Sequence, residues 1–186
     1  MKVTTVLLFC ACALAISAVP AQAEGFITPF IGYNFGGDSG NCPAINDCST
    51  KRTNYGVSIG EMGSLLGIEE DLSFAKHFFG DAPNSDNSVF SAMTNLLVGV
   101  GVGPVRPYAL AGVGLIRPHV SSPGFSSDNN AFGWDLGVGL TVSVAPHVGI
   151  RGDVRHLHTF QDVDLSLLSS ERLDFFRASL GVALRF

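Results

Sequence analysis

The alternation of side chains in residues 176–186 constrains the fold more than any other feature. Apolar side chains occupy every second position, namely Phe176, Ala178, Leu180, Val182, Leu184 and Phe186. Arginines, a serine, a glycine and an alanine stand between them. A period of two is that of a β-strand. One apolar face and one polar or small face indicate a strand that lies between two different surroundings.

The same alternation recurs along the chain. We predict further strands over residues 26–35, 54–62, 66–75, 90–99, 105–116, 132–142 and 148–157, which makes eight with the terminal strand. The links after the second, fourth and sixth strands are tight, and the others are long and polar. Such a rhythm predicts an antiparallel up-and-down meander that closes on itself and leaves no free edge.

The composition favours strands that cross a membrane. Mean hydropathy is +0.33, and charged residues make up 15%, whereas about 25% is usual in soluble domains. After residue 23, no apolar run approaches the roughly 20 residues that a spanning helix needs. A transmembrane strand needs only about 9–11 residues and conceals its hydrophobicity by alternation.

The N-terminus has the features of a secretory signal peptide. Lys2 precedes an apolar stretch, and Ala21-Gln22-Ala23 is a small-x-small cleavage site. We therefore expect residues 1–23 to be a signal peptide that is cleaved before Glu24. Residues 24–186 would then form a single barrel domain.

Cys42 and Cys48 remain after removal of the signal peptide. An even number of cysteines in an exported chain predicts a disulfide between them. Two cysteines without neighbouring histidines are a poor metal site. The net charge of −5 gives no support to nucleic-acid binding, which needs a basic surface. No cofactor motif is present.

The C-terminal pattern resembles the signal by which the insertion machinery of bacterial outer membranes recognises β-barrel proteins. The matching positions are Ser179, Gly181, Leu184 and Phe186. The chain as a whole is similar to the small eight-stranded OmpA/OmpX-like outer-membrane barrels. Besides that signal, the resemblance is carried by residues 29–36, 67–69, 107–108, 112–114 and 149–151.

This resemblance implies an all-β fold, an eight-stranded antiparallel up-and-down transmembrane β-barrel in the outer membrane of a Gram-negative type bacterium. It implies outer-membrane lipids and the insertion machinery as partners. The long loops would contact lipopolysaccharide or external surface ligands. These loops span residues 37–53, 76–88, 117–130 and 158–172, which are rich in Asp, Asn, Ser and Gly.

Charged residues fall on the strand faces that we expect to point into the barrel. They are Glu69, Asp71, Arg106, Asp135, Arg151, Asp153, Arg155, Arg177 and Arg185. An eight-stranded barrel is just wide enough for side chains to fill it, and buried charges need partners. We expect a plug of salt bridges in the lumen. The alternative is a narrow ion channel that opens when one pair breaks.

Glu70 does not fit this scheme, because simple alternation points it toward lipid. Either a β-bulge shifts the strand or Glu70 lies near a membrane interface.

His156 and His158 share one face at the loop end of a predicted strand. We interpret them as interfacial residues that flank a membrane strand. A metal site at the rim is one alternative. A lipid-modifying hydrolase is another, because a histidine can act with a hydroxyl and an acid. The candidate hydroxyls and acids are Thr159, Ser169, Asp162 and Glu171.

The sequence thus predicts a non-enzymatic integral outer-membrane barrel with a structural, adhesive or surface-interaction role, and we assign no catalytic, cofactor-binding or metal-binding residue. The hydrolase and the narrow channel remain as alternatives. A soluble sandwich or a lipocalin-like ligand binder would require the apolar faces to point inward.

Overall fold

The computed structural model describes residues 23–37, 53–78, 86–122, 125–128, 130–160 and 172–186. Within these ranges the chain forms nine strands. They are β1 (Glu24–Phe35), β2 (Thr53–Met62), β3 (Leu66–Lys76), β4 (Asp86–Gly99), β5 (Val105–Ser122), β6 (Phe125–Asp128), β7 (Ala131–Ala145), β8 (Val148–Thr159) and β9 (Asp174–Arg185). Among the described residues, no helix is long and apolar enough to cross a membrane.

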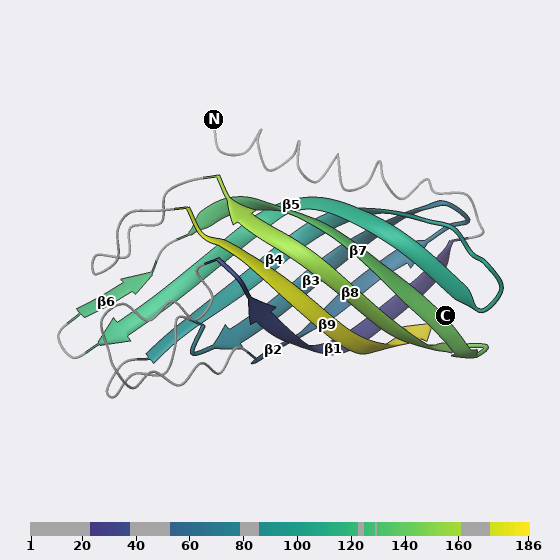
Figure 1. The fold of residues 1–186 in the computed structure, drawn as a ribbon, viewed down its shortest axis with the longest axis horizontal. Coiled ribbons are helices and arrows are strands. Elements are labelled where there is room, and N and C mark those ends of the chain that lie inside the picture. Colours follow the sequence, from purple (N-terminus) through teal and green to yellow (C-terminus); the bar gives the residue numbers. More distant parts are fainter. Residues whose placement is uncertain (1–22, 38–52, 79–85, 123–124, 129, 161–171) are drawn as a thin grey trace, which may run out of the picture.

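Eight of these strands close into an antiparallel barrel (Figure 1). Each strand pairs with its neighbours in the order β4-β3-β2-β1-β9-β8-β7-β5, and the pairing of β4 with β5 completes the circle. The first and last strands meet from Phe26↔Arg185 to Phe35↔Phe176. The predicted eight-stranded antiparallel barrel is therefore confirmed.

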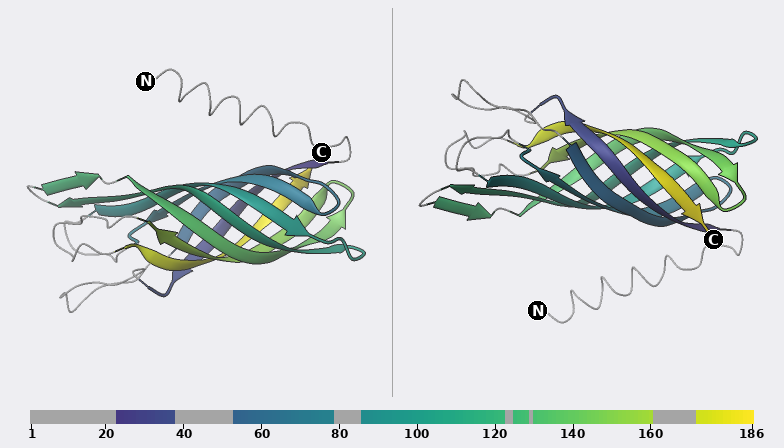
Figure 2. Two further views of the ribbon diagram at one scale, coloured as in Figure 1. Left: turned by 90° about the horizontal axis from the view of Figure 1, so that it is seen from above. Right: turned by 90° about the horizontal axis from the view of Figure 1, so that it is seen from below.

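One expectation about the connections was wrong. We expected residues 117–130 to form a loop, but β5 continues to Ser122 and pairs with β6, from His119↔Asp128 to Ser122↔Phe125. This hairpin projects beyond the barrel wall (Figures 1 and 2). Residues 117–130 are mostly polar. The contrast between an apolar and a polar face, by which a strand is detected, disappears although the backbone ladder continues.

The tight connections lie together at one end of the barrel, which we call the turn end. They comprise residues 63–65, 100–104 and 146–147. Gly103 adopts a φ of +60°, a conformation that glycine tolerates without a steric penalty. The opposite end, where β1, β3, β5 and β8 finish, is called the loop end. Figure 2 shows both ends from two sides.

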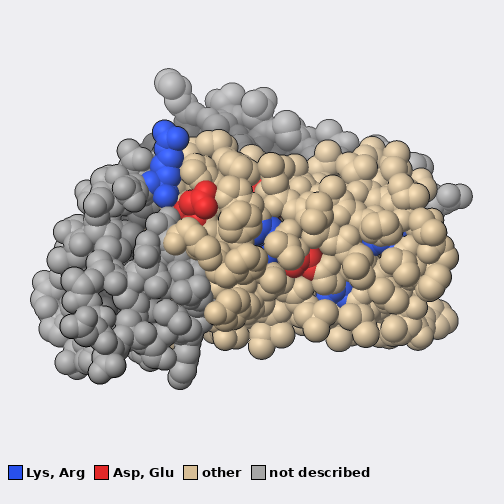
Figure 3. All heavy atoms as spheres, viewed as in Figure 1, with Lys and Arg blue, Asp and Glu red and all other residues tan. Residues whose placement is uncertain are grey.

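The outward face of the wall is apolar. Large hydrophobic side chains there are widely exposed, for example Ile31 at 60%, Val138 at 64% and Leu180 at 59%. Charged atoms occupy only small patches of the wall seen in Figure 3. An outward apolar band combined with a polar interior is the arrangement of a transmembrane barrel.

The interior is arranged in layers. An apolar cluster fills the loop end with Ala75, Phe78, Val89, Met93, Ile116, Ala131, Leu157, Leu173 and Phe175. A second apolar cluster lies toward the turn end and contains Phe26, Met62, Leu97, Tyr108 and Leu110. Between these two clusters lies a layer of buried charged residues.

Candidate functional site

The charged layer crosses the lumen and draws its side chains from β3, β7, β8 and β9. Its members are Glu69, Asp71, Asp135, Arg151, Asp153, Arg155 and Arg177, each less than a tenth exposed. Within each strand they fall on the alternate positions that the pleat places on the inner face. The structure thus brings together in one cluster seven of the nine residues that the sequence indicated as inward charges, whereas Arg106 and Arg185 lie at the turn end.

Arg155 is the centre of this cluster and is only 1% exposed. Its guanidinium lies 2.9 Å from Glu69 and 2.9 Å from Asp153. Asp71 at 3.4 Å and Asp135 at 3.7 Å complete its surroundings. A planar guanidinium carries five N–H donors and is always charged, so one arginine can serve several carboxylates.

The other two arginines each combine an ion pair with an aromatic ring. Arg177 lies 2.7 Å from Asp71 and stacks 5.0 Å from the ring centre of Phe30. Arg151 pairs with Glu69 and lies 4.7 Å from the ring centre of Tyr108. Such contacts between a cation and a ring strengthen when both are desolvated.

Neutral residues that the sequence analysis did not assign to the lumen network complete it. The hydroxyl groups of Tyr108 and Ser179 donate to Asp153 at 2.9 and 2.8 Å. Ser58 donates to Asp71 at 2.9 Å, and Asn95 donates to Glu69 at 3.3 Å. They occupy inward positions of the same alternation, and this was the signal that could have identified them.

Two glycines leave room for this network. A Cβ atom at Gly139 would collide with the hydroxyl of Tyr108, and one at Gly112 would collide with the side-chain oxygen of Asn95. Glycine is placed where a neighbouring group approaches the backbone closely. The inward glycines of β5 and β7 are therefore part of the site.

Asp135 is the least well paired member of the layer. Neither of its carboxylate oxygens has a hydrogen-bond partner among the described residues. Its ion-pair partner is Arg155, at 3.7 Å. The layer contains four carboxylates and three guanidinium groups, so one acidic group is in excess. Asp135 is therefore the carboxylate with the weakest pairing in the layer.

The charged layer and the loop-end apolar cluster together fill the lumen with side chains. In the apolar cluster, Phe78 and Phe175 meet edge to face at 4.7 Å between ring centres. Ions would have to displace both layers to pass. This packing can keep the lumen closed to ions and can tie opposite strands of the barrel together.

The proposed insertion signal lies on both faces of β9 and ends one residue beyond it, at Phe186. Ser179 and Gly181 point inward, whereas Leu184 and Phe186 point outward, with Phe186 73% exposed. The backbone of Phe186 exchanges two hydrogen bonds with Gly25, of 2.9 and 3.0 Å. The last residue thus extends the seam between β1 and β9.

Glu70 points outward near the middle of β3. The strand pairs with β2 and β4 without a register shift, so the bulge alternative is wrong. Thr94, directly opposite on β4, donates from its hydroxyl to both carboxylate oxygens of Glu70, at 2.8 and 3.0 Å. This bond gives the outward carboxylate a local partner.

His156 and His158 point outward at the loop end and share one carboxylate. Asp174 lies 2.8 Å from Nε2 of His156 and 3.0 Å from Nδ1 of His158. Trp134 packs against both imidazoles, and Phe176 stacks on His156 at 4.6 Å. The cluster therefore belongs to an aromatic rim on the outer wall.

Thr159 does not join this cluster. It points inward and is buried, and its hydroxyl accepts a hydrogen bond from the backbone N–H of Leu173 at 2.8 Å. A catalytic arrangement of either histidine with Thr159 is thus wrong, because the wall separates them. In the described part of the chain, no group of three or more His, Cys, Asp or Glu residues could hold a metal ion.

Several predicted residues lie outside the described ranges. They are Cys42 and Cys48, the hydrolase candidates Asp162, Ser169 and Glu171, and the expected signal peptide up to residue 22. The disulfide and the cleavage before Glu24 stay predictions.

Comparison with known proteins identifies relatives of this barrel. Residues 8–186 match the model of the family described as outer membrane protein beta-barrel domain. A search of curated proteins returned no significant match.

Several solved structures share the fold. Neisserial surface protein A is 17% identical, with a TM-score of 0.59, and the match covers 89% of this chain and 96% of that one. The N-terminal β-barrel domain of Pseudomonas aeruginosa OprF is 15% identical, with a TM-score of 0.56 and coverage of 89% and 98%. The attachment invasion locus protein Ail of Yersinia pestis is 14% identical, with a TM-score of 0.55 and coverage of 89% and 99%. At these identities the likeness concerns the fold.

Proposed function

The chain belongs to the outer membrane protein beta-barrel domain family, and from this premise we propose that it acts at the cell surface through its loop end. It is an integral protein of the bacterial outer membrane. In such barrels the short turns face the periplasm and the longer loops face outward. We propose a surface-interaction or adhesive role without enzymatic activity.

The filled lumen is the observation that carries this proposal. Arg155 and its carboxylates close the middle of the barrel, and Phe78 and Phe175 close the loop end. In the described part of the chain these side chains occupy the lumen, so we infer that external partners meet the protein at its loop end. The names of two structural neighbours, a surface protein and an attachment protein, are in keeping with such a role.

The partners follow from the three surfaces of the barrel. We propose that the outward apolar band contacts outer-membrane lipids and that the insertion machinery reads the terminal strand. Lipopolysaccharide or external ligands would be bound by the loop end, through residues 38–52, 79–85 and 161–171 in particular. These segments are rich in Asp, Asn and Ser, which supply hydrogen-bonding groups.

Surface display tests the proposal. Bacteria that display the wild-type barrel, and matched bacteria without it, would be compared for attachment to a sulfated polysaccharide, a matrix protein and epithelial cells. Variants with residues 38–52 or 161–171 replaced by a short Gly-Ser linker should lose attachment. Equal amounts of folded barrel would be verified by the change in gel mobility on boiling. Full attachment by both variants, or no attachment by the wild type, would contradict the proposal.

The channel and hydrolase alternatives need separate measurements. The purified barrel in planar bilayers should produce no conductance steps, and regular steps would favour the channel. Lipid A extracted from expressing cells should be the same for the wild type and for a double variant, His156→Ala with His158→Ala. A modification that depends on either histidine would establish the hydrolase instead.

A further inference from the structure

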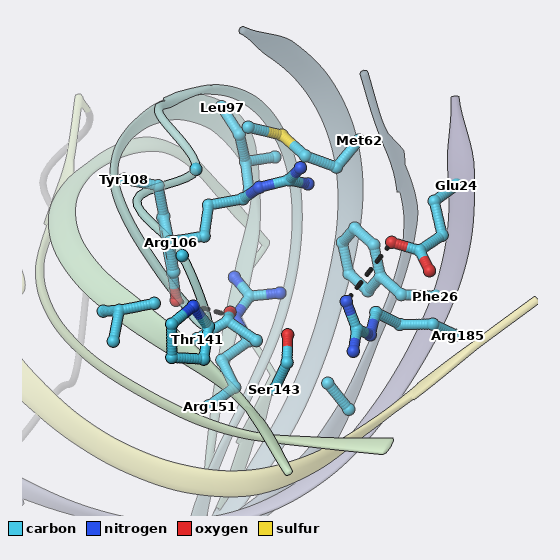
Figure 4. A pocket seen from close by; sticks show the side chains of 15 residues that line it. Glu24, Phe26, Met62, Leu97, Arg106, Tyr108, Thr141, Ser143, Arg151 and Arg185 are labelled. Atoms are coloured by element: carbon cyan, nitrogen blue, oxygen red, sulfur yellow. Dashed lines mark hydrogen bonds and ion pairs between the residues drawn. The ribbon is translucent and has the colours of Figure 1, made fainter. Parts of the chain in front are cut away.

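A cavity of about 140 Å³ opens at the turn end of the barrel, on the turn-end side of the charged layer (Figure 4). Three arginines from different strands surround it, Arg106 of β5, Arg151 of β8 and Arg185 of β9. Figure 4 shows their guanidinium groups converging on the same space. Arg151 is paired with Glu69 of the charged layer. Among the other described lining residues, Arg106 and Arg185 face the single acidic residue Glu24, which leaves one positive charge in excess at the cavity.

Arg151 is a fixed donor at the inner wall of this cavity. It is only 4% exposed. Its Nη1 pairs with Glu69, and its Nε donates to the hydroxyl of Tyr108 at 2.6 Å. The rings of Phe26 and Tyr108 hold the guanidinium at 5.2 and 4.7 Å. Its Nη2 has no hydrogen-bond partner among the described residues.

Arg106 and Arg185 also retain donor capacity. Arg106 lines the cavity without a hydrogen bond or ion pair to another described residue. Arg185 pairs with Glu24 at 3.4 Å and donates to the carbonyl of Ala145 at 3.2 Å, but its Nε remains without a partner. Arg106 is half-buried, so its unpaired donors are open to a ligand with acceptor oxygens.

The cavity suits a small anion. Ser143 and Thr141 line it with hydroxyl groups, and Figure 4 shows the Ser143 hydroxyl directed into it. A water molecule takes about 30 Å³, so a volume of about 140 Å³ has room for a group of phosphate size. Guanidinium groups bind phosphate oxygens through paired, charge-assisted hydrogen bonds.

We propose that this turn-end cavity binds a small phosphate-class oxyanion from the periplasmic side. The anion would accept hydrogen bonds from Arg106 and Arg185, while the buried guanidinium of Arg151 adds positive charge at the inner wall. It would neutralise the positive charge that Glu24 leaves unbalanced. The same chemistry is offered by free phosphate and by the phosphate of a phospholipid headgroup. This inference is independent of the role proposed for the loop end.

The test uses the full mature barrel folded in an uncharged detergent and titrated with inorganic phosphate in a calorimeter, with ionic strength kept constant by chloride. We expect saturable binding. Arg106→Gln should weaken it about tenfold or more, the effect of losing one charge-assisted hydrogen bond. Arg117→Gln, the same change on the same strand but at the loop end, should leave it unchanged.

Competition separates the two sources of phosphate. A short-chain phosphatidylglycerol that displaces phosphate from the wild type would identify a headgroup as a ligand, and a lipid that does not compete would identify the free anion. Absence of saturable binding to the wild type, or equal weakening by Arg106→Gln and Arg117→Gln, would overturn the site. If Arg106→Gln does not fold, Arg106→Lys keeps the charge but loses the planar fork, and binding should fall several-fold.

Discussion

Arg155 of β8 donates a hydrogen bond of 2.9 Å to Glu69 of β3, a residue 86 positions earlier in the chain. In the sheet, β2, β1 and β9 separate these two strands. The bond therefore spans the lumen and ties opposite sides of the wall together. Backbone pairing links only neighbouring strands, so this side-chain bond is a cross-brace of the barrel.

Loss of this brace should weaken the barrel strongly. Arg155→Gln would leave Glu69, Asp71, Asp135 and Asp153 buried without their shared cation, and breaking a buried pair costs about 3–5 kcal/mol. We expect the free energy of unfolding in urea to fall by that order, measured by the gel mobility of the folded band. A decrease in the free energy of unfolding of less than about 1 kcal/mol would contradict the role of Arg155 as a brace.

Asp135 should behave in the opposite way. Asp135→Asn removes the carboxylate without hydrogen-bond partners and leaves the closer pairs of Arg155 in place. We expect unfolding free energy to be unchanged or raised. The matched control, Asp71→Asn, breaks the 2.7 Å pair with Arg177 and should lower it. Equal destabilisation by the two variants would contradict the unequal pairing that the structure shows.

The Glu70–Thr94 pair predicts a coupling on the lipid-facing wall. Thr94→Val should lower unfolding free energy by about 1–3 kcal/mol, because a hydrogen bond to a charged group is lost in apolar surroundings. Glu70→Leu should have no effect or should stabilise the barrel. In a double-mutant cycle, Thr94→Val should cost little in the Glu70→Leu background. Additive effects would show that the bond contributes nothing.

Phe186 should matter for insertion and little for stability. Its side chain is exposed and its backbone makes the bonds to Gly25, so Phe186→Ser should leave the refolded barrel nearly as stable. In cells, less of this variant should reach the outer membrane if the insertion machinery reads the terminal aromatic residue. Phe132→Ser, an equally outward change on β7, is the control and should insert normally.

The periodic features of this barrel were predictable from the sequence, because they are local. Alternation determines which side of the wall each residue faces, so the apolar outer surface and the inward charges from Glu69 to Arg177 follow from numbering within a strand. The rhythm of tight and long links determines the meander. These inferences need only residues that are neighbours in the chain.

The pairings were decided by the closed barrel. Which carboxylates surround Arg155, why Asp135 is poorly paired, and that Thr94 stands opposite Glu70 depend on strand register and closure. The sharing of Asp174 by His156 and His158, and the convergence of Arg106, Arg151 and Arg185, depend on them as well. The sequence determined on which face each side chain lies. Only the tertiary structure decided what it meets there, because register joins residues far apart in the chain, and a shift of two residues would preserve every face and change every partner.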